Sequence, residues 1–564
     1  MTKKEASLDE ALEVANKWLI NDPDETTKVE TENLISRGDI EFIQRFSNSL
    51  VFGTAGIRGA RGAGPMRMNR VMVRVVANAI AKELLSVEQG DEPPLVVVGY
   101  DARYKSQIFA QDSVRVLAGL GVRSLILPRP LPTPVLAYTS LAKKAKAGIM
   151  VTASHNPAED SGYKVYWDDG AQIVNPVDLK IAQRIDYKNP PTEESLADYE
   201  DVTILKGGDE LIKEYVDFAS SFVSPESKRE INQIYTPLHG VGKEVFLEVF
   251  EKAGFKKPML VKSQAEPDPE FPTVSFPNPE EEGALDLAVD LAVEKNADLV
   301  IANDPDADRL AVVVRHEDKW RCLNGNEIGA LLAEHVLSKG QGEERLVVTT
   351  VVSSSLLSKI ADFHKVKYAE TLTGFKWIVR PGIEDERLRF VFGYEEALGF
   401  ALGDSVRDKD GITSALVFAE LAAELKAEGK TVMDLLNQLW DRHGVHKTAL
   451  FTKRLDPEID ISADFMSSWR ASPPEQIGEF DVTEVVDLLI PESNLPPTDA
   501  LVFNLSNGRI VIRPSGTEPM VKVYVEVIES VINGDIMSAE TSVDHKIEDL
   551  LHGVNSLFQV EKDL

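Results

Sequence analysis

The sequence predicts an α/β protein whose last part changes to an α+β domain with an antiparallel sheet. Short apolar runs recur with helical patterns between them, which is typical of parallel sheets. Near the end of the chain, apolar residues instead alternate with period two on either side of the turn pair Asn507-Gly508. At 564 residues the chain is too long for one compact core, so we expect several domains.

Strands are expected where apolar residues run together, and helices where they recur every three or four positions. The strands expected in the α/β part are Leu95–Val98, Ser124–Leu127, Ile149–Thr152, Leu299–Ala302 and Leu346–Val352. Amphipathic helices are expected at Met72–Leu85 and Gly283–Glu294. The strands expected in the last part are Asp499–Leu505, Arg509–Ile512 and Val521–Val527, followed by a closing helix that includes Val543 to Leu557.

Composition limits the classes of function. The formal net charge of −31 argues against nonspecific attraction to nucleic acid or to an acidic membrane, so a phosphate ligand would need a local group of donors. No run of eighteen apolar residues occurs, and charged residues near the start replace the apolar stretch of a signal peptide. The single cysteine, Cys322, excludes an internal disulfide. We therefore expect a soluble, cytoplasmic protein.

The first loop with recognisable chemistry is Thr152-Ala153-Ser154-His155-Asn156-Pro157, which follows the apolar run Gly148–Val151. Such a loop exposes a hydroxyl at the carboxyl end of a sheet, where α/β proteins usually bind ligands, so Ser154 is a candidate nucleophile. The alternative is a capped turn in which Ser154 bonds only its own backbone. Lys164, ten residues later, can accept a proton only if its pKa is lowered; otherwise it is a surface lysine.

The second loop, Asp304-Pro305-Asp306-Ala307-Asp308-Arg309, lies between two apolar runs. Three carboxylates at alternate positions of an extended segment repel one another unless a cation lies between them. Ligation by oxygen alone selects a hard cation, Mg²⁺ before Ca²⁺ if a phosphate oxygen completes the shell. A solvated acidic turn is the alternative, but the flanking strands favour a metal site.

The third loop, Gly393-Tyr394-Glu395-Glu396-Ala397-Leu398-Gly399-Phe400, follows an expected strand at Arg389–Phe392. Its carboxylates can accept hydrogen bonds from neighbouring sugar hydroxyls. Cations that could hold a phosphate lie nearby in sequence, in Thr373-Gly374-Phe375-Lys376 and in Asp408-Lys409-Asp410-Gly411. Each of these segments, taken alone, is equally consistent with an ordinary surface loop.

The fourth loop, Arg513-Pro514-Ser515-Gly516-Thr517-Glu518-Pro519, connects two strands of the last part. One guanidinium, two hydroxyls and the backbone N–H groups of a glycine-containing turn form a donor array suited to a phosphate dianion. The alternative is a plain hairpin connection, which would not need Arg, Ser and Thr together.

These four loops, in this order, resemble those of the α-D-phosphohexomutase superfamily, the phosphoglucomutases and phosphomannomutases. The strings at Thr152–Pro157, Asp304–Arg309 and Arg513–Pro519 are each specific, and Phe52–Gly59 and Tyr163-Lys164 match as well. The resemblance implies a four-domain architecture, three related α/β domains and a C-terminal α+β domain around a central cleft. The expected domains, named by their loops, are 1–200 (phosphoserine), 201–323 (metal), 324–445 (sugar) and 446–564 (phosphate).

The resemblance also implies a role for individual residues. Ser154 would be the phosphoserine, and its phosphate would bind Mg²⁺ together with the aspartates. Lys164 would be the general base, with Arg58 and His155 beside the transferring phosphate. The metal ligands would be Ser154, Asp304, Asp306 and Asp308, and substrate would be bound by Arg309, Thr373, Gly374, Lys376, Glu395, Lys409, Arg513, Ser515, Gly516 and Thr517.

The implied activity is a sugar-phosphate mutase that works through a phosphoserine and a bisphosphate intermediate. We expect interconversion of sugar 1-phosphate and sugar 6-phosphate, with glucose as the first candidate sugar and mannose as the second. Mg²⁺ is the expected cofactor, and a sugar bisphosphate such as glucose 1,6-bisphosphate is the expected activator. The expected partner is a small sugar phosphate, not nucleic acid or membrane, and the chain is expected to be a monomer or a weak homodimer.

One departure from the family pattern leaves the sugar open. Many relatives have a serine two residues beyond the glutamate that matches Glu395, and here that position is Ala397. The Gly-Tyr-Glu-Glu form is similar to the branch that contains phosphoglucomutase-2 and phosphopentomutase proteins, so ribose and deoxyribose 1- and 5-phosphates are alternative substrates. Two rival classes are a metal-dependent phosphatase and a sugar-phosphate sensor without catalysis.

Overall fold

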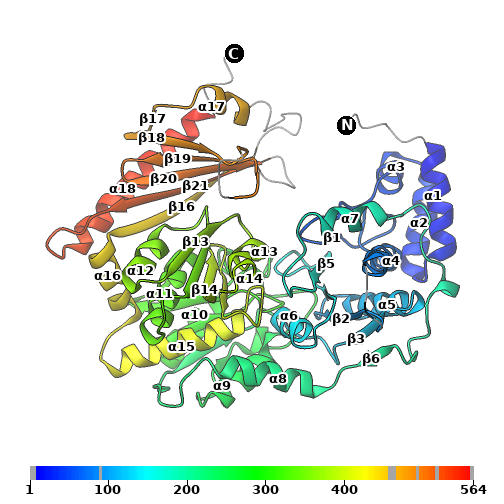
Figure 1. Ribbon diagram of the computed structural model, residues 1–564, viewed down its shortest axis with the longest axis horizontal. Helices are drawn as coiled ribbons and strands as arrows, with labels where there is room; N and C mark the ends of the chain where they lie inside the picture. The colour runs from blue at the N-terminus through cyan, green and yellow to red at the C-terminus, as the bar shows by residue number, and fades with distance from the viewer. Residues whose placement is uncertain are drawn as a thin grey trace. The chain divides into compact units, whose positions relative to one another are not determined.

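The computed structural model describes residues 8–87, 90, 92–454, 465–490, 495–514 and 520–558 (Figure 1). The chain divides into two compact units. Unit 1 contains the residues up to Leu323 together with Gly399–Ala427, and unit 2 contains Asn324–Leu398 and the residues from Glu428 onward. Gly399–Ala427, which the expected third domain includes, therefore groups with unit 1.

Unit 1 begins with three helices that the sequence analysis did not predict. They are α1 (Leu8–Asn21), α2 (Glu25–Arg37) and α3 (Ile40–Phe46). Asp24 caps α2 by accepting the N–H of Thr26, as is common at helix starts. The rings of Trp18 and Phe46 pack edge to face with centroids 6.3 Å apart, so the helices share a small apolar core.

The first sheet of unit 1 has the strand order β1-β5-β4-β2-β3-β6. The central strands β4, β2, β3 and β6 pair in parallel, and β5 and β1 are added antiparallel. Helix α4 was expected to be amphipathic, but Arg74 and Glu83 on it are buried as well, because other helices pack against it. The elements are β1 (Ile57–Ala60), α4 (Arg70–Ser86), β2 (Leu95–Tyr100), α5 (Ser106–Gly119), β3 (Arg123–Ile126), α6 (Thr133–Ala142), β4 (Ala147–Val151), β5 (Asp160–Trp167), α7 (Val177–Arg184), a 3₁₀ helix (Glu193–Ser195) and β6 (Ile204–Lys206).

The second sheet of unit 1 has the order β11-β10-β9-β7-β8. Strands β9, β7 and β8 are parallel, while β10 and β11 are antiparallel. Helix α15 packs against α8 and α9, which is why residues after Gly399 belong to this unit. The elements of this region are α8 (Asp209–Ser220), β7 (Gln233–Thr236), α9 (Gly242–Lys252), β8 (Met259–Leu260), a 3₁₀ helix (Lys262–Gln264), α10 (Asp286–Lys295), β9 (Leu299–Ala302), β10 (Ala311–His316), β11 (Lys319–Cys322) and α15 (Gly411–Ala427). Strand β15 (Gly399–Leu402) also groups with unit 1 but is not a strand of this sheet.

Unit 2 contains a parallel and an antiparallel region. Strand β12 pairs in parallel with β13 and β14, and the last sheet has the antiparallel order β16-β21-β20-β19-β18-β17. The first elements are α11 (Gly325–Lys339), β12 (Arg345–Thr350), α12 (Leu356–His364), β13 (Lys367–Thr371), α13 (Phe375–Ile378), α14 (Arg380–Glu384) and β14 (Arg389–Glu395). The remainder are α16 (Val432–His443), β16 (Val445–Arg454), α17 (Ser467–Ala471), β17 (Gln476–Ile477), β18 (Phe480–Asp487), β19 (Leu501–Leu505), β20 (Gly508–Pro514), β21 (Met520–Glu529) and α18 (Ile536–Leu557).

The expected elements are present with small shifts at their ends. The expected strand Leu299–Ala302 is identical to β9, and the expected helix Gly283–Glu294 begins later, at Asp286. The antiparallel character of the last sheet is confirmed, as is the closing helix, whose Val543, Leu550 and Val554 are buried. Among the described residues, no helix combines the length and the apolar character needed to cross a membrane.

Candidate active site

The Ser154 side chain lies where two loops of unit 1 meet. Its hydroxyl Oγ is 2.7 Å from Oδ2 of Asp304, and its backbone N–H donates to Oγ1 of Thr152 at 2.9 Å. Ser154 is almost fully buried and has a φ of 50°, which is unusual for a residue with a side chain. Such strained positions occur often at functional sites, where the surrounding contacts hold them in place.

Arg103 holds the backbone of the Ser154 loop. Its guanidinium donates to the carbonyl oxygens of Ser154 and Asn156 at 2.6 Å each, and to that of Pro157 at 2.7 Å. Asp101 accepts the backbone N–H of Arg103 at 3.0 Å. Sequence reasoning missed this residue, although an acidic and a basic residue directly after the apolar strand β2 were an available signal.

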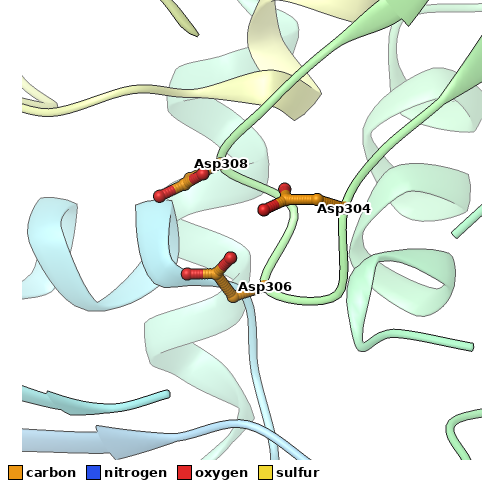
Figure 2. A group of neighbouring side chains, drawn as sticks. All are labelled: Asp304, Asp306 and Asp308. Carbon is orange, nitrogen blue, oxygen red and sulfur yellow. The ribbon is translucent and has the colours of Figure 1, made fainter. Parts of the chain in front are cut away.

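Asp304, Asp306 and Asp308 extend into the same region from the loop between β9 and β10 (Figure 2). All three are fully buried, and one oxygen from each lies within 4.8 Å of the others. Burial, and then the charges of the other two aspartates, raise the pKa of Asp304 well above its usual value. Oδ1 of Asp306 and Oδ1 of Asp308 are buried without a hydrogen-bond partner among the described residues. Unpaired carboxylate oxygens this close together fit a hard divalent cation.

Two lysines contact the aspartate cluster. Lys164 Nζ lies 2.7 Å from Oδ2 of Asp306 and 2.8 Å from Oδ2 of Asp308, and Lys409 Nζ lies 3.3 Å from the latter oxygen. Burial disfavours the charged form of Lys164, but the two carboxylates outweigh burial and raise its pKa. In this arrangement Lys164 is protonated, which is the opposite of what a proton acceptor requires.

His155 and Arg58 lie around the same loop. His155 Nδ1 is 3.4 Å from the Ser154 hydroxyl oxygen, and Arg58 donates to Oδ1 of Asn156 at 2.7 Å. Burial, followed by the charges of Arg309 and Arg58, lowers the pKa of His155 to about 2. The imidazole is therefore neutral at pH 7, so it acts here as a hydrogen-bonding group and not as a cation.

Arg309 connects the metal loop to the segment that carries Lys409. Its backbone N–H donates to Oδ1 of Asp304 at 3.0 Å, and its side chain donates to Glu280 at 3.2 Å. Arg309 also pairs with Gly399 in an isolated antiparallel bridge. A Cβ on Gly411 would lie 2.2 Å from the Arg309 carbonyl oxygen, so this close approach requires glycine at 411.

Two further residues support the cluster: sequence reasoning missed Thr133, and it named the segment of Asp408 but gave that residue no role. Thr133, at the start of α6, donates its hydroxyl to Oδ2 of Asp306 at 2.6 Å. Asp408 accepts the hydroxyl of Tyr166 at 2.6 Å, beside Lys409. Thr133 belongs to no local motif, and the partner of Asp408 lies far away in the sequence, so only the folded chain shows both contacts.

In unit 2, the paired glutamates at the end of β14 have different surroundings. Glu396 lies within hydrogen-bond distance of Ser353 at 3.2 Å and of Thr350 at 3.4 Å. Glu395 as a whole residue is 9% exposed, and no residue in the described ranges donates a hydrogen bond to its carboxylate. The Glu395 carboxylate is therefore available to accept a hydrogen bond from a sugar hydroxyl, whereas Glu396 already lies near two hydroxyls, which favours Glu395 as the candidate sugar-binding residue.

A cavity of about 460 Å³ in unit 2 contains three of the expected phosphate-binding residues. Thr373, Lys376 and Arg513 line it, and the Arg513 guanidinium donates to the Thr373 hydroxyl. Gly374 has a φ of 107°, a conformation that favours glycine. Ser515, Gly516 and Thr517 lie outside the described residues.

Comparison with known proteins places these observations in a family. Four domain models of the phosphoglucomutase/phosphomannomutase family match the chain: α/β/α domain I at residues 49–191, domain II at 213–318, domain III at 324–443 and the C-terminal domain at 475–540. The chain is 42% identical to a probable phosphomannomutase of Haemophilus influenzae over 82% of its own length and 93% of the relative's.

Two other relatives have different names. The chain is 34% identical to a phosphoglucomutase of Staphylococcus aureus strain USA300, over 87% of this chain and 92% of that one. It is 33% identical to a probable phosphoribomutase of Schizosaccharomyces pombe, over 91% of this chain and 93% of that one.

Solved structures share the fold. A putative phosphomannomutase from Thermus thermophilus superimposes with a TM-score of 0.70 at 21% identity, over 91% of this chain and 99% of that one. A phosphoglucomutase/phosphomannomutase family protein from Burkholderia thailandensis superimposes with a TM-score of 0.67 at 20% identity, over 90% of this chain and 97% of that one. With all four domain models present, the chain belongs to the phosphoglucomutase/phosphomannomutase family and is a sugar-phosphate mutase of the α-D-phosphohexomutase superfamily.

Proposed function

We propose that this enzyme interconverts a hexose 1-phosphate and a hexose 6-phosphate through phosphorylated Ser154 and a sugar bisphosphate. The observation that carries the proposal is the 2.7 Å contact between the Ser154 hydroxyl and Asp304 within a buried carboxylate cluster. A nucleophile beside a site suited to a divalent cation is the arrangement that phosphoryl transfer requires. Phosphoserine donates its phosphoryl group to the free sugar hydroxyl, and the other phosphate of the bisphosphate then returns to Ser154.

The cation we propose is Mg²⁺, held by Asp304, Asp306, Asp308 and the serine phosphate. When bound, it would stabilise negative charge on the serine oxygen as the oxygen–phosphorus bond breaks. The fully buried oxygens without donors on Asp306 and Asp308 support this assignment. Oxygen-only ligation together with a phosphate favours Mg²⁺ over softer metals.

The remaining residues are proposed to bind and orient the substrate. Lys164 would accept the proton of the attacking sugar hydroxyl, which requires that its contacts to Asp306 and Asp308 weaken so that its pKa falls. Neutral His155 and cationic Arg58 would lie beside the transferring phosphate. The substrate-binding set is Arg309, Lys409 and Glu395, with Thr373, Gly374, Lys376, Arg513, Ser515, Gly516 and Thr517 around the second phosphate.

The relatives leave two sugar classes to be tested. Those from Haemophilus and Staphylococcus are named for hexose phosphates and support glucose or mannose as the sugar. The Schizosaccharomyces relative is named a probable phosphoribomutase, which supports ribose or deoxyribose phosphate as the alternative. Ala397 removes a hydroxyl donor from the sugar loop, so the preference depends on Glu395 and on contacts that replace that donor.

The proposal also covers the activator, the cellular location and the oligomeric state. Glucose 1,6-bisphosphate or a similar bisphosphate would serve as activator by phosphorylating Ser154. The enzyme would act in the cytoplasm, where its single cysteine, Cys322, would stay reduced. It would be a monomer or a weak homodimer.

A parallel coupled assay with glucose 1-phosphate, mannose 1-phosphate and ribose 1-phosphate tests the proposal. Turnover of a hexose phosphate with the highest kcat/KM supports the hexose assignment, and a preference for ribose 1-phosphate replaces it with the pentose alternative. Release of inorganic phosphate would point to a phosphatase. No turnover of any of the three, with saturable binding retained, would point to a sensor.

A further inference from the structure

Arg103, which fixes the Ser154 loop, is covered by an aromatic ring from another part of unit 1. The Cζ atom of Arg103 lies 4.9 Å from the ring centroid of Phe271, within the range of a cation–π contact. Both side chains are buried, at 4% exposure for Arg103 and 3% for Phe271. Phe271 has a φ of 48°, so its backbone is held in a conformation that a bulky residue seldom adopts.

The segment that carries Phe271 is attached to the same turn as the metal loop. Val241 donates its N–H to the carbonyl of Pro305 at 2.8 Å, and Asp268 donates its N–H to the carbonyl of His239 at 3.0 Å. A Cβ on Gly240 would lie 2.3 Å from Cα of Pro305, so the turn and the metal loop are in direct contact. The position of Phe271 is therefore tied to that of the aspartates.

The far end of the Phe271 segment is anchored by side chains. The His239 ring nitrogen Nε2 lies 2.8 Å from the hydroxyl of Thr273, and Gln264 donates to the same hydroxyl at 3.0 Å. Gln264 in turn accepts the hydroxyl of Thr236, at the end of β7. These contacts fix the segment on both sides of Phe271, so that its ring is a rigid cover for Arg103.

We propose that Phe271 is a positioning residue for Ser154, acting through Arg103. The ring holds the guanidinium in the one orientation that reaches the three carbonyls of the Ser154 loop, and the shared turn aligns that loop with Asp304. The inference rests on the proposed function, because it concerns the geometry in which Ser154 gives and receives phosphate. Phe271 itself does not contact the hydroxyl of Ser154 in this arrangement; its effect passes through the loop backbone.

The chain offers a matched control in the pair Phe255 and Arg229. The Cζ atom of Arg229 lies 5.7 Å from the Phe255 ring centroid, and its guanidinium donates to the carbonyls of Ala253 and Ser224 at 2.5 Å each. This pair has the same chemistry as Phe271 and Arg103. It holds the end of α9 and the segment before β7, not the loop of Ser154.

The first test compares F271L and F255L in the mutase assay with saturating sugar bisphosphate. Leucine keeps an apolar side chain but removes the ring face, so F271L should lower kcat roughly two- to thirty-fold, the range expected for a cation–π contact. KM should be unchanged because no substrate contact is lost. F255L should leave both parameters unchanged. An unchanged kcat in F271L, or an equal loss in F255L, would overturn the inference.

A double-mutant cycle tests whether the effect passes through Arg103. R103K keeps the charge but cannot donate to three carbonyls in the same geometry, so it should lower kcat by itself. If Phe271 acts only by orienting Arg103, F271L should add little further loss in the R103K background. If the loss of kcat in the double variant equals the product of the losses in F271L and R103K, Phe271 acts independently of Arg103 and the inference is wrong.

Amide hydrogen exchange supplies a readout that does not depend on turnover. F271L should accelerate exchange in the peptide that contains residues 152–158, relative to the peptide of β9, whereas F255L should not. Unchanged protection of that peptide in F271L would contradict the inference even if the enzyme is a mutase. Conversely, a wild-type protein that turns over no sugar phosphate would refute the proposed function and leave this exchange result as the test of the positioning role.

Discussion

At the Ser154 site, burial and neighbouring charges change the protonation of individual side chains. The imidazole of His155 is neutral at pH 7, and the pKa of Lys164 is raised by Asp306 and Asp308 although the ammonium is buried. Burial, and then the charges of Asp306 and Asp308, disfavour the charged form of Asp304 and raise its pKa. The states of Lys164 and Asp304 depend on the charge of the aspartate cluster, so a cation bound there would change both, whereas His155 is kept neutral by burial and by Arg309 and Arg58.

The first prediction concerns that cation. Chelation with EDTA should abolish mutase activity, and added Mg²⁺ should restore it, because the carboxylates need a cation to coexist with a phosphoserine. Asp306→Asn should raise the Mg²⁺ concentration needed for half-maximal activity and lower the maximal rate. Asp318→Asn, on the short connection between β10 and β11, is the control and should change neither value. Full activity of the wild type in excess chelator would rule out a metal role.

The second prediction separates the two neighbouring glutamates of the sugar loop. Glu395→Gln should lower kcat/KM roughly ten- to a hundred-fold, as expected when a charged hydrogen bond to a sugar hydroxyl is lost. Glu396→Gln should mainly lower stability, because Glu396 is hydrogen-bonded to Ser353 and Thr350. Kinetics and thermal melting of both variants decide the assignment. If Glu396→Gln has the larger effect on kcat/KM, the assignment is reversed.

At the scale of elements, the sequence predicts the site best where the functional residues directly follow a strand in the sequence. The strand β9 and the three aspartates that follow it form one continuous pattern, as do β4 and Ser154, so the loops could be predicted with their positions at strand ends. Thr133 could not be found in this way, because it lies 173 residues from the aspartate that it contacts. Arg103 lies 51 residues from Ser154 and acts on its backbone carbonyl, which no side-chain motif encodes.

Other elements were missed because local patterns are ambiguous. The sequence of helix α4 predicts an amphipathic helix, yet most of its residues are buried on every face. Its buried Arg74 forms a salt bridge to Asp112 at 2.8 Å. Helices α1 to α3 precede the part of the chain that the family models match, so no motif drew attention to them. The choice between Glu395 and Glu396 likewise required the partners of each side chain.

The third prediction belongs to unit 2, where Glu526 links the last sheet to the start of α12. Glu526 accepts the N–H of Ser355 at 2.9 Å and the hydroxyl of Ser354 at 2.5 Å. Burial works against its charge, but the hydrogen bond from His446 and the charge of Arg509 outweigh burial and hold the pKa of Glu526 at about 2, below its ordinary 4.5. Its stabilising effect is therefore complete above about pH 4.5 and is lost as the pH falls toward 2.

Glu526→Gln should consequently lower the melting temperature at pH 7, because breaking a buried ion pair costs about 3–5 kcal/mol. Below pH 4.5 the difference between variant and wild type should shrink, because this carboxyl group takes up a proton in the unfolded wild-type chain and so stabilises the folded state less. Glu484→Gln, on the exposed side of β18, is the control. A difference in melting temperature that is the same at pH 7 and at pH 3 would contradict the role of the charge.

At the scale of the whole molecule, the two units divide the expected chemistry. Unit 1 contains the proposed nucleophile Ser154, the aspartate cluster and both lysines, while unit 2 contains Glu395, Glu396 and the cavity lined by Lys376 and Arg513. With a net charge of −31, the protein as a whole repels phosphates, so these local cations are what makes binding possible.

The most direct test of the account is a pulse–chase measurement of phosphate on Ser154. Dephosphorylated enzyme is incubated with Mg²⁺ and radiolabelled glucose 1,6-bisphosphate, and the labelled peptide is identified by mass spectrometry. The label should be on Ser154 and should pass to sugar phosphate when unlabelled glucose 1-phosphate is added. Ser154→Ala should take up no label, whereas Ser161→Ala, a buried serine on β5, should behave as wild type. Label on another residue, or full mutase activity in Ser154→Ala, would contradict the central claim that phosphate passes through Ser154.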